Sequence, residues 1–342
     1  MMEFWLRYDL RSPAFGRGSA ELVRAAIEQV EWADKRGFHR VELTEHHGMP
    51  DNVNPSPLIT AAAMASRSSR IRFQPSAIIL PLHDPIRIAE DCVMVDIVSN
   101  GRLDVTLGLG YMPSEFEMFG VRLKDRGELM DRKLDALGRA LKGDRFEYDG
   151  RTIHVTPSPV QDGGPTLFIG GGVLATARRA ARFGDGYYPM TYRTDFVEEY
   201  HRACAEFGRA PGRVIHGAGS AVLHIAEDPD EAWATLAPHA LHETNSYAEN
   251  AAKAGQTLHQ KPAGSVEALR ASGNYIVLTP DEGLTYCREQ RDLGRHVVLN
   301  PLISGIDPAF SWRSLELIAS RIIPALQADD AARSLGKENP AS

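Results

Sequence analysis

Short runs of apolar and β-branched residues recur along the chain, and amphipathic stretches lie between them. Eight of these runs have the length of a β-strand. They cover Phe4–Tyr8, Arg40–Leu43, Ile71–Leu80, Leu103–Leu107, Thr166–Ile169, Gly186–Pro189, Val214–Ile225 and His296–Leu299. The stretch Glu21–Arg36 is the clearest helix, because its apolar residues recur at helical spacing and Gly37 follows it as a C-terminal cap. This alternation predicts a parallel sheet covered by helices.

Eight strand–helix units close most naturally into a barrel, so the sequence predicts an α/β protein with a (β/α)₈ TIM-barrel fold. An open doubly wound sheet is the alternative, but no G-x-G-x-x-G motif follows the first strand. The length of 342 residues would allow two domains, yet barrels of about 200 to more than 400 residues are common. We therefore expect one domain over residues 1–327.

Two segments interrupt the alternation, and a third lies at the end of the chain. Gly143–Gly164 carries short apolar alternations around Asp149-Gly150, which predicts a small hairpin insertion. Leu241–Ile276 is rich in Ala, Asn, Gly and His and lacks a clear strand pattern. It is interpreted as an insertion that borders the barrel mouth and moves when ligand binds. Residues 328–342 are expected to be a frayed tail.

Composition narrows the classes of function. The 38 basic and 45 acidic residues give a net charge of −7 without a basic stripe, which argues against nucleic acid as a partner. No apolar run reaches the ~18 residues of a membrane-spanning helix, and the first residues do not resemble a signal peptide. The three cysteines are odd in number, lie far apart and form no C-x-x-C pair, which argues against a disulfide framework or a zinc ribbon and favours a reducing cytoplasm.

The first candidate for chemistry is Glu45-His46-His47, directly after the second predicted strand. Active sites of TIM barrels lie at the C-terminal ends of the strands, and an imidazole there can exchange protons near neutral pH. The plainer interpretation is a solvated loop. A metal-dependent hydrolase that uses these three residues and His83 is a further alternative. Against it, the sequence has no H-x-H or H-E-x-x-H pair.

The second candidate is the glycine run after the fifth predicted strand. Gly170, Gly171 and Gly172 precede Val173 and a helix that contains Thr176. Backbone N–H groups at a helix start suit a phosphate, and a threonine hydroxyl adds a donor. A tight turn alone is the competing explanation, although three consecutive glycines exceed what a turn needs.

Glycine also ends the fourth predicted strand, in the sequence Thr106-Leu107-Gly108-Leu109-Gly110-Tyr111. Such a position either relieves crowding or lets a flat ligand approach the backbone.

Ordered motifs along most of the chain resemble the bacterial luciferase-like flavin monooxygenase family. They are Glu45-His46-His47, Asn54-Pro55, Leu80-Pro81, Pro85-Ile86-Arg87, Ala89-Glu90, Ser99-Asn100-Gly101-Arg102-Leu103, Glu115-Phe116, Phe119-Gly120, Ala180-Ala181 and Gly184-Asp185-Gly186. The resemblance spans roughly Phe4 to Leu326 and implies a (β/α)₈ barrel that binds reduced flavin mononucleotide (FMN) or a deazaflavin at its mouth. It also implies a homodimer.

The resemblance assigns roles to residues of this chain. His46 is similar to the histidine that supports the oxygen chemistry, and Glu45 to a neighbouring carboxylate on the flavin side. Ser76-Ala77 falls where the family often has a cis peptide behind the flavin ring, and Gly108 lies beside the flavin. The phosphate-binding residues would be Gly171, Gly172, Val173 and Thr176. His47, Tyr111, Met112 and Met190 would line the substrate pocket.

Two departures from the family pattern matter. Bacterial luciferase has a reactive cysteine at the position of Gly108 and an arginine that contacts phosphate at the position of Leu109. Without that cation, phosphate binding would depend on backbone donors, the helix dipole and Thr176.

The resulting prediction is a flavin-dependent monooxygenase that uses reduced FMN and oxygen to oxygenate a small organic substrate. A separate flavin reductase would supply the cofactor, because no nicotinamide fingerprint is present. A deazaflavin-dependent dehydrogenase or reductase is the nearest alternative. A non-catalytic flavin-binding protein is the other alternative, beside the hydrolase.

Overall fold

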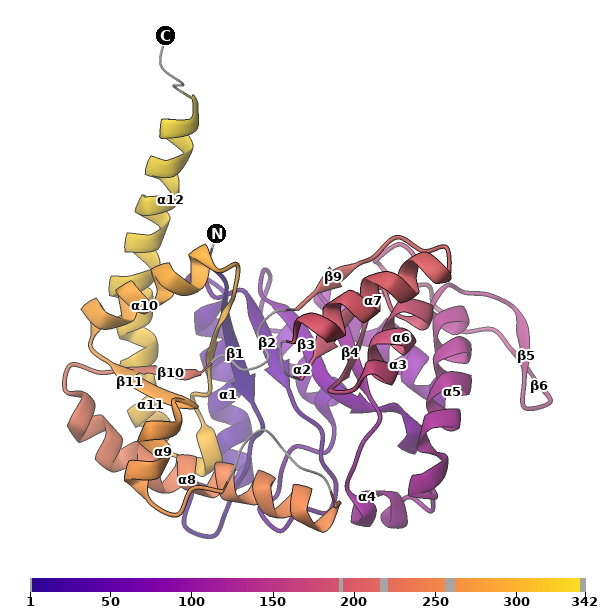
Figure 1. Ribbon diagram of the computed structural model, residues 1–342, viewed down its shortest axis with the longest axis horizontal. Helices are drawn as coiled ribbons and strands as arrows, with labels where there is room; N and C mark the ends of the chain where they lie inside the picture. Colours follow the sequence, from indigo (N-terminus) through magenta and orange to yellow (C-terminus); the bar gives the residue numbers. More distant parts are fainter. Residues whose placement is uncertain (1, 191–192, 216–220, 256–261, 339–342) are drawn as a thin grey trace.

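The computed structural model describes residues 2–190, 193–215, 221–255 and 262–338 (Figure 1). Its main sheet has ten strands in the order β11-β10-β12-β1-β2-β3-β4-β7-β8-β9, and every pairing in it is parallel. The strands are β1 (Phe4–Tyr8), β2 (Arg40–Leu43), β3 (Arg72–Ile79), β4 (Asp104–Gly108), β7 (Thr166–Gly171), β8 (Gly186–Pro189), β9 (Arg213–Val214), β10 (Val222–Ile225), β11 (Tyr275–Leu278) and β12 (Val297–Leu299).

Helices lie between the strands and pack on the outside of the sheet. They are α1 (Ser19–Ala33), α2 (Pro57–Ala65), α3 (Pro85–Ser99), α4 (Pro113–Met118), α5 (Arg126–Leu141), α6 (Leu174–Phe183), α7 (Thr194–Glu206), α8 (Pro229–Lys253), α9 (Val266–Ser272), α10 (Pro280–Asp292), α11 (Pro308–Leu317) and α12 (Ile323–Glu338). Among the described residues, no helix combines the length and the apolar character needed to cross a membrane.

The segment of the chain that contains β9 and β10 reaches both ends of the strand order, because β9 is the last strand at one end and β10 lies next to β11 at the other. In that segment β9 pairs with β8, and β10 pairs with β12 next to β1. A parallel sheet that returns to its first strands through such a segment is a barrel. The predicted TIM-barrel fold is therefore confirmed.

Seven of the eight predicted strands are confirmed to within two residues. Val214–Ile225 is wrong as one strand, because it contains two short strands, β9 and β10. The prediction runs through Gly217 and Gly219, and glycine weakens a strand interior. Those two glycines lie outside the described residues.

The segment Leu241–Ile276, expected to be an insertion without a clear strand pattern, is largely helical among the residues that the structure describes. This segment contains the second half of α8, the whole of α9 and the first two residues of β11. Pro238 would ordinarily end a helix, yet α8 continues beyond it to Lys253. Movement of this segment on ligand binding stays a prediction.

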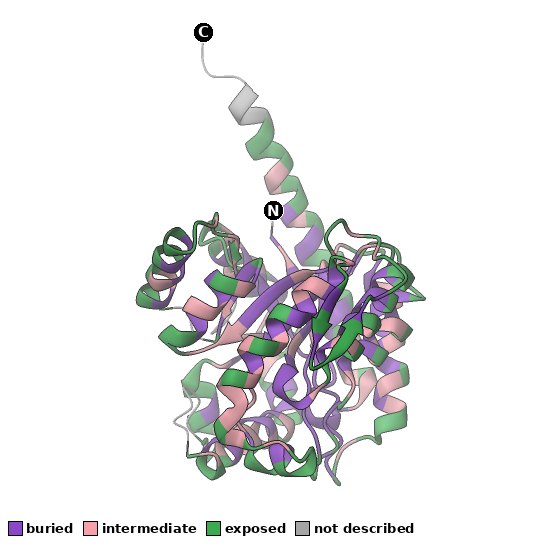
Figure 2. Cartoon of the chain, turned by 90° about the vertical axis from the view of Figure 1, so that its right-hand side faces the viewer, coloured by how far each residue is buried: buried purple, intermediate pink, exposed green. Residues whose placement is uncertain are grey.

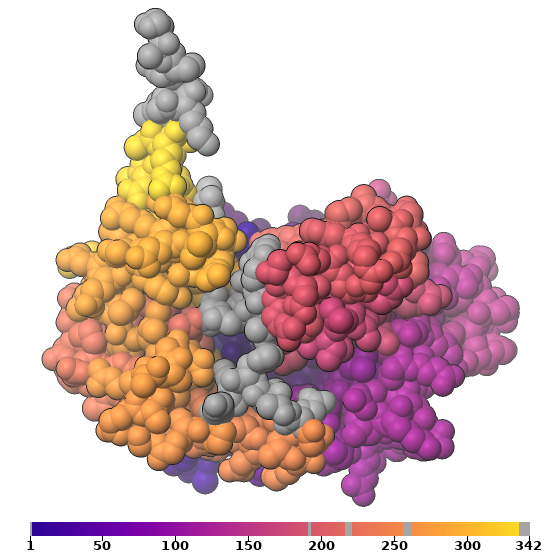
Figure 3. Space-filling view, in the orientation of Figure 1, coloured from indigo at the N-terminus to yellow at the C-terminus, as the bar shows by residue number. Residues whose placement is uncertain are grey.

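The tail predicted to fray is helical as far as Glu338. Helix α12 stands off from the barrel (Figures 2 and 3). Over residues 323–334, where burial is described, its buried side chains are confined to the first turn. Farther along, Asp329 pairs with Arg288 and Arg291 of α10. These ion pairs hold α12 against α10, and they could not be predicted from the composition of the tail alone.

The predicted hairpin is confirmed: β5 (Phe146–Tyr148) and β6 (Arg151–Ile153) pair antiparallel. Asp149 and Gly150 between them have φ of 48° and 71°, as a tight two-residue turn requires. The hairpin lies at the edge of the molecule (Figure 1).

Polar side chains fill much of the barrel interior. The Tyr188 hydroxyl on β8 donates to Glu42 on β2 at 2.8 Å, and because these strands are not neighbours the bond crosses the interior. Below it, Arg40 donates to Gln74 and lies over the Trp5 ring. TIM-barrel interiors are usually packed with branched apolar residues. A polar interior beneath the strand ends therefore suits a site built from hydrogen bonds.

Candidate active site

The strand ends bring His46 against a buried carboxylate of α4. His46 Nδ1 lies 2.9 Å from Glu115 Oε1, and the same oxygen accepts the backbone N–H of His47 at 3.0 Å. The Glu115 side chain is fully buried. An ionised carboxylate can only accept hydrogen bonds, so the hydrogen bond assigns the proton to Nδ1. Neutral His46 then carries an unprotonated Nε2, which has no hydrogen-bond partner among the described residues.

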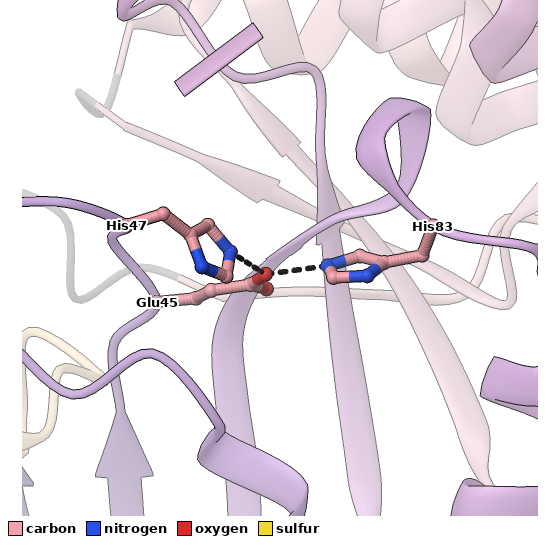
Figure 4. Close-up of side chains that lie close together, drawn as sticks. All are labelled: Glu45, His47 and His83. Atoms are coloured by element: carbon pink, nitrogen blue, oxygen red, sulfur yellow. Dashed lines mark hydrogen bonds and ion pairs between the residues drawn. The ribbon is translucent and has the colours of Figure 1, made fainter. Parts of the chain in front are cut away.

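A second buried carboxylate joins three of the predicted residues. Glu45 Oε1 lies 2.7 Å from His47 Nε2 and 2.5 Å from His83 Nε2 (Figure 4). Glu45 Oε2 accepts the backbone N–H of Ile79 at 2.9 Å. Lys133 on α5 donates to the carbonyl oxygen of His83 at 2.7 Å and so holds its loop.

These contacts change the role expected for Glu45. Both of its oxygens are occupied by protein donors, and the residue is only 3% exposed. We therefore place Glu45 among the groups that position the site rather than those that touch a cofactor.

The same three side chains are the metal candidate of the hydrolase alternative. Their ligand atoms lie within 4.8 Å of one another. Zinc bonds of about 2.0–2.2 Å would separate two ligand atoms by about 3 Å or more. The 2.5 and 2.7 Å separations are hydrogen bonds instead. His46 points to Glu115 and is not part of the cluster, so the structure brings together three of the four residues named for the hydrolase.

Burial and hydrogen bonding shift the pKa of Glu45 in opposite directions. Burial favours the neutral acid, but hydrogen bonds from His47 and His83 and the charge of His83 outweigh it, so the pKa of Glu45 is lowered. Its carboxylate is therefore the stable form in the folded protein at neutral pH.

The predicted phosphate turn lies at the end of β7 and the start of α6. A Cβ on Gly171 would meet the Thr176 hydroxyl at 2.8 Å, so glycine allows the backbone to pass close to Thr176. Val173 is the N-cap of α6, and the N–H groups that follow a cap have no helical acceptor. The structure thus combines glycine backbone, free helix donors and a hydroxyl.

The expected flavin-side residues of β3 and β4 lie next to each other. The Ser76–Ala77 peptide bond is cis, as the resemblance implies. A Cβ on Gly108 would lie 2.9 Å from the Ala77 Cβ, so the missing side chain leaves room for this peptide. The Ser76 hydroxyl also contacts Thr106 at 3.1 Å.

The four predicted pocket residues are dispersed. The Tyr111 ring lies edge-on to His46 with centroids 6.1 Å apart. Met112 is buried at the start of α4, whereas Met190 is exposed beside Gly172. His47 belongs to the Glu45 cluster. Only Tyr111 is brought next to His46.

Helix α8 adds residues that the sequence did not single out. Tyr247 lies near His46, with ring centroids 6.0 Å apart, and its hydroxyl accepts from Arg7 of β1 at 3.3 Å. Arg7 also pairs with buried Glu243 at 3.1 Å. The one available signal was Arg7 itself, a charged residue within an otherwise apolar strand.

Comparison with known proteins identifies the family of this chain. The model of the luciferase-like monooxygenase family matches residues 8–281. The chain belongs to this family. Luciferase-like monooxygenases are oxidoreductases, and the recognition drawn from the motifs is confirmed.

Two relatives illustrate the range of the family. Limonene 1,2-monooxygenase of Rhodococcus erythropolis is 25% identical over 92% of this chain and 84% of its own length. The oxygenase component of the flavin-dependent trigonelline monooxygenase of Acinetobacter baylyi is 28% identical, over 49% of this chain and 48% of its own length.

Solved structures share the fold. The oxygenating constituent of 3,6-diketocamphane monooxygenase from Pseudomonas putida, in complex with FMN, gives a TM-score of 0.69 at 20% identity and covers 94% of this chain and 98% of its own. An F420-dependent secondary alcohol dehydrogenase gives a TM-score of 0.67 at 16% identity and covers 95% of this chain and 98% of its own.

The Glu45 cluster makes a testable prediction about stability. Because folding lowers its pKa, ionised Glu45 stabilises the protein fully above about pH 4.5, and this contribution is lost as the pH falls through the lower folded value. Glu45→Gln should lower the free energy of unfolding by about 2–4 kcal/mol at pH 7. The difference from the unsubstituted protein should narrow below pH 4.5.

Urea unfolding at several pH values measures both effects. Glu117→Gln, at an exposed position of α4, is the matched control and should change little. Parallel pH curves for Glu45→Gln and the unsubstituted protein would contradict this interpretation.

Proposed function

We propose that this protein oxygenates a small organic substrate with molecular oxygen, using reduced FMN from a separate reductase. When bound, the flavin supplies two electrons, and one oxygen atom enters the substrate while the other leaves as water. The observation that carries the proposal is His46, held by Glu115 at the mouth of a barrel of this family.

His46 is proposed to move a proton at its Nε2. The Glu115 carboxylate holds Nδ1–H and stabilises the imidazolium that forms when Nε2 gains a proton. Glu115 is thus a positioning residue for His46. Tyr111, beside His46, stays a neutral phenol because burial, with the neighbouring Tyr247 and Glu115, raises its pKa.

The residues around the strand ends fit a flavin. Gly108 and the Ser76–Ala77 peptide offer a flat surface without bulky side chains. Gly171, Gly172, Val173 and Thr176 are proposed to hold the phosphate. An FMN complex of a protein with the same fold supports this assignment.

A separate reductase is the partner that this chemistry requires. The trigonelline enzyme's name describes an oxygenase component, which supports a two-component system here.

A deazaflavin-dependent dehydrogenase is the second candidate. Leu109 supplies no charge to the phosphate site, and an F420-dependent dehydrogenase shares the fold. Cofactor titration, described below, separates the two proposals.

Substituting His46 tests the chemistry. His46→Ala should lower turnover by about 10²–10⁴-fold if the imidazole transfers a proton. The measurement is oxygen-dependent product formation with reduced FMN, on a substrate found by an oxygen-uptake screen. The affinity for FMN should change less than about threefold, because the phosphate turn belongs to another strand–helix unit.

His154→Ala, at an exposed histidine of the hairpin region, is the control and should keep full turnover. Unaltered turnover of His46→Ala would remove His46 from the mechanism. It would also favour a flavin-binding protein without this chemistry.

The phosphate turn predicts a ranking of ligands. FMN should bind more tightly than riboflavin, and Thr176→Val should weaken FMN binding by about threefold to tenfold, the effect of one hydrogen bond. Gly171→Leu should weaken it further, because its side chain would collide with Thr176. Calorimetric titration with FMN, riboflavin and the deazaflavin coenzyme measures all three effects.

Thr194→Val, at the exposed first residue of α7, serves as the control. Equal affinity for riboflavin and FMN would contradict the phosphate site. Binding of the deazaflavin alone would replace the oxygenase proposal by the dehydrogenase.

A homodimer is proposed through the outer faces of α2 and α3. Met94, Ile97 and Val98 of α3 are 48%, 36% and 42% exposed and share one face of the helix, and Ile59 of the adjacent α2 is 74% exposed. A second copy can cover such a patch through a two-fold axis, with the same residues on both sides.

Met94→Lys should therefore convert the dimer into a monomer, because it places a charge in an apolar interface. Sedimentation velocity measures the change. Met118→Lys, at an exposed methionine of α4, should leave the dimer intact. An unsubstituted protein that sediments as a monomer at micromolar concentration would contradict the proposal.

A further inference from the structure

The side chain of Tyr247 reaches the active site from α8, an element outside the motifs that identify the family. We infer that its hydroxyl donates a hydrogen bond to an oxygen atom of the substrate beside His46. The inference rests on the proposed function and adds to it a class of substrate: neutral organic molecules that carry a carbonyl or hydroxyl oxygen close to the carbon that is oxidised.

The phenol of Tyr247 is fixed from three sides. Arg7 Nη2 donates to its oxygen at 3.3 Å. The Arg11 guanidinium lies over its ring, 4.5 Å from the centroid, and the His46 ring meets it at 62° with centroids 6.0 Å apart. These contacts place the Tyr247 ring next to Arg11 and the proposed catalytic imidazole, with its hydroxyl on Arg7.

Hydrogen-bond counting shows what the hydroxyl still offers. A phenol oxygen that accepts from Arg7 retains its own hydrogen as a donor. In the part of the chain that the structure describes, no acceptor receives this hydrogen. The Tyr111 hydroxyl, on the second phenol ring next to His46, likewise has no hydrogen-bond partner among those residues. Two phenol donors therefore lie beside His46, and an acceptor oxygen of the substrate would satisfy them.

The position of Tyr247 is secured one helical turn earlier. Glu243, four residues before it, lies on the same face of α8. This carboxylate is 1% exposed and accepts from Arg7 at 3.1 Å, from the Tyr275 hydroxyl at 2.5 Å and from Asn300 at 3.4 Å. Strands β1 and β11 and the end of β12 thus hold the face of α8 that presents Tyr247. A donor held this rigidly loses little conformational entropy when it binds.

The charges around the phenol limit the substrate class. Arg7 and Arg11 both contact Tyr247. Both guanidinium groups are paired, with Glu243 and with Asp9 and Asp51, so no unbalanced positive charge remains there to select an anion or to repel a cation, and a neutral substrate needs no ionic partner. The rings of Tyr111 and Tyr247 add apolar walls. A neutral, mostly apolar molecule with one oxygen acceptor fits all three conditions.

Binding of two probes with one carbon skeleton tests the inference. Camphor and its parent hydrocarbon bornane differ only by the carbonyl oxygen. Their affinities for the protein loaded with oxidised FMN are measured from changes in flavin absorbance. Tyr247→Phe should weaken camphor binding by about threefold to tenfold, the effect of one hydrogen bond. Bornane binding should change less than twofold, and the affinity for FMN and the thermal midpoint should be unchanged.

Tyr148→Phe, in the hairpin, is the matched control and should alter neither affinity. Equal weakening of both probes by Tyr247→Phe would overturn the hydrogen bond in favour of simple packing. Unchanged camphor binding would exclude contact with the substrate oxygen. If the FMN-loaded protein binds no cyclic ketone from cyclohexanone to camphor, the substrate class is overturned. Failure of the unsubstituted protein to bind FMN would instead overturn the proposed function.

Discussion

A carboxylate buried at the end of a barrel strand is stable only if protein donors surround it, and this constraint organises the active site. Transfer of an unpaired ionised carboxylate out of water costs several kcal/mol or more. Glu45, Glu115 and Glu243 are each 3% exposed or less. Glu45 and Glu243 each collect donors from several elements, and Glu115 Oε1 accepts from His46 and from the backbone of His47. These donors include the groups proposed to act on the substrate or to hold its neighbours.

This arrangement connects stability to chemistry. Glu115 brings α4 to the end of β2 through His46, and Glu243 brings α8 to β1 through Arg7. Removing either carboxylate would free an imidazole or a guanidinium and also loosen a helix at the mouth. The same hydrogen bonds therefore set the tautomer of His46 and the enclosure of the site.

Much of the barrel is predictable from local sequence because strands of a parallel sheet are buried on both faces and appear as short apolar runs. The helical part of Leu241–Ile276 was not predictable in this way, because Pro238 and a polar composition argue against a long helix. The order β11-β10-β12 was equally hidden, because the first two residues of β11 fall within the segment Leu241–Ile276 that was interpreted as an insertion.

The residues of the candidate site likewise differ in whether local sequence could indicate them. Glu45 and His46 stand at a strand end, where the fold itself indicates function. Glu115 lies 69 residues from His46 and Tyr247 lies on a different helix, so their proximity depends on the closed barrel. Glycines in the phosphate turn were recognisable because three in succession are rare. That His47 and His83 both hydrogen-bond to Glu45 could be recognised only from the three-dimensional positions of β2 and β3.

Helix α12 has a practical consequence. A helix that follows the last barrel strand runs antiparallel to it, so α12 points away from the strand ends that carry the active site, and the N-terminal strand begins on that same side (Figure 1). Coupling this protein to a solid support, or fusing it to a reductase, through the C-terminal helix would leave the barrel mouth facing the solution. The helix would then act as a spacer of about 1.5 Å per residue between the support and the barrel.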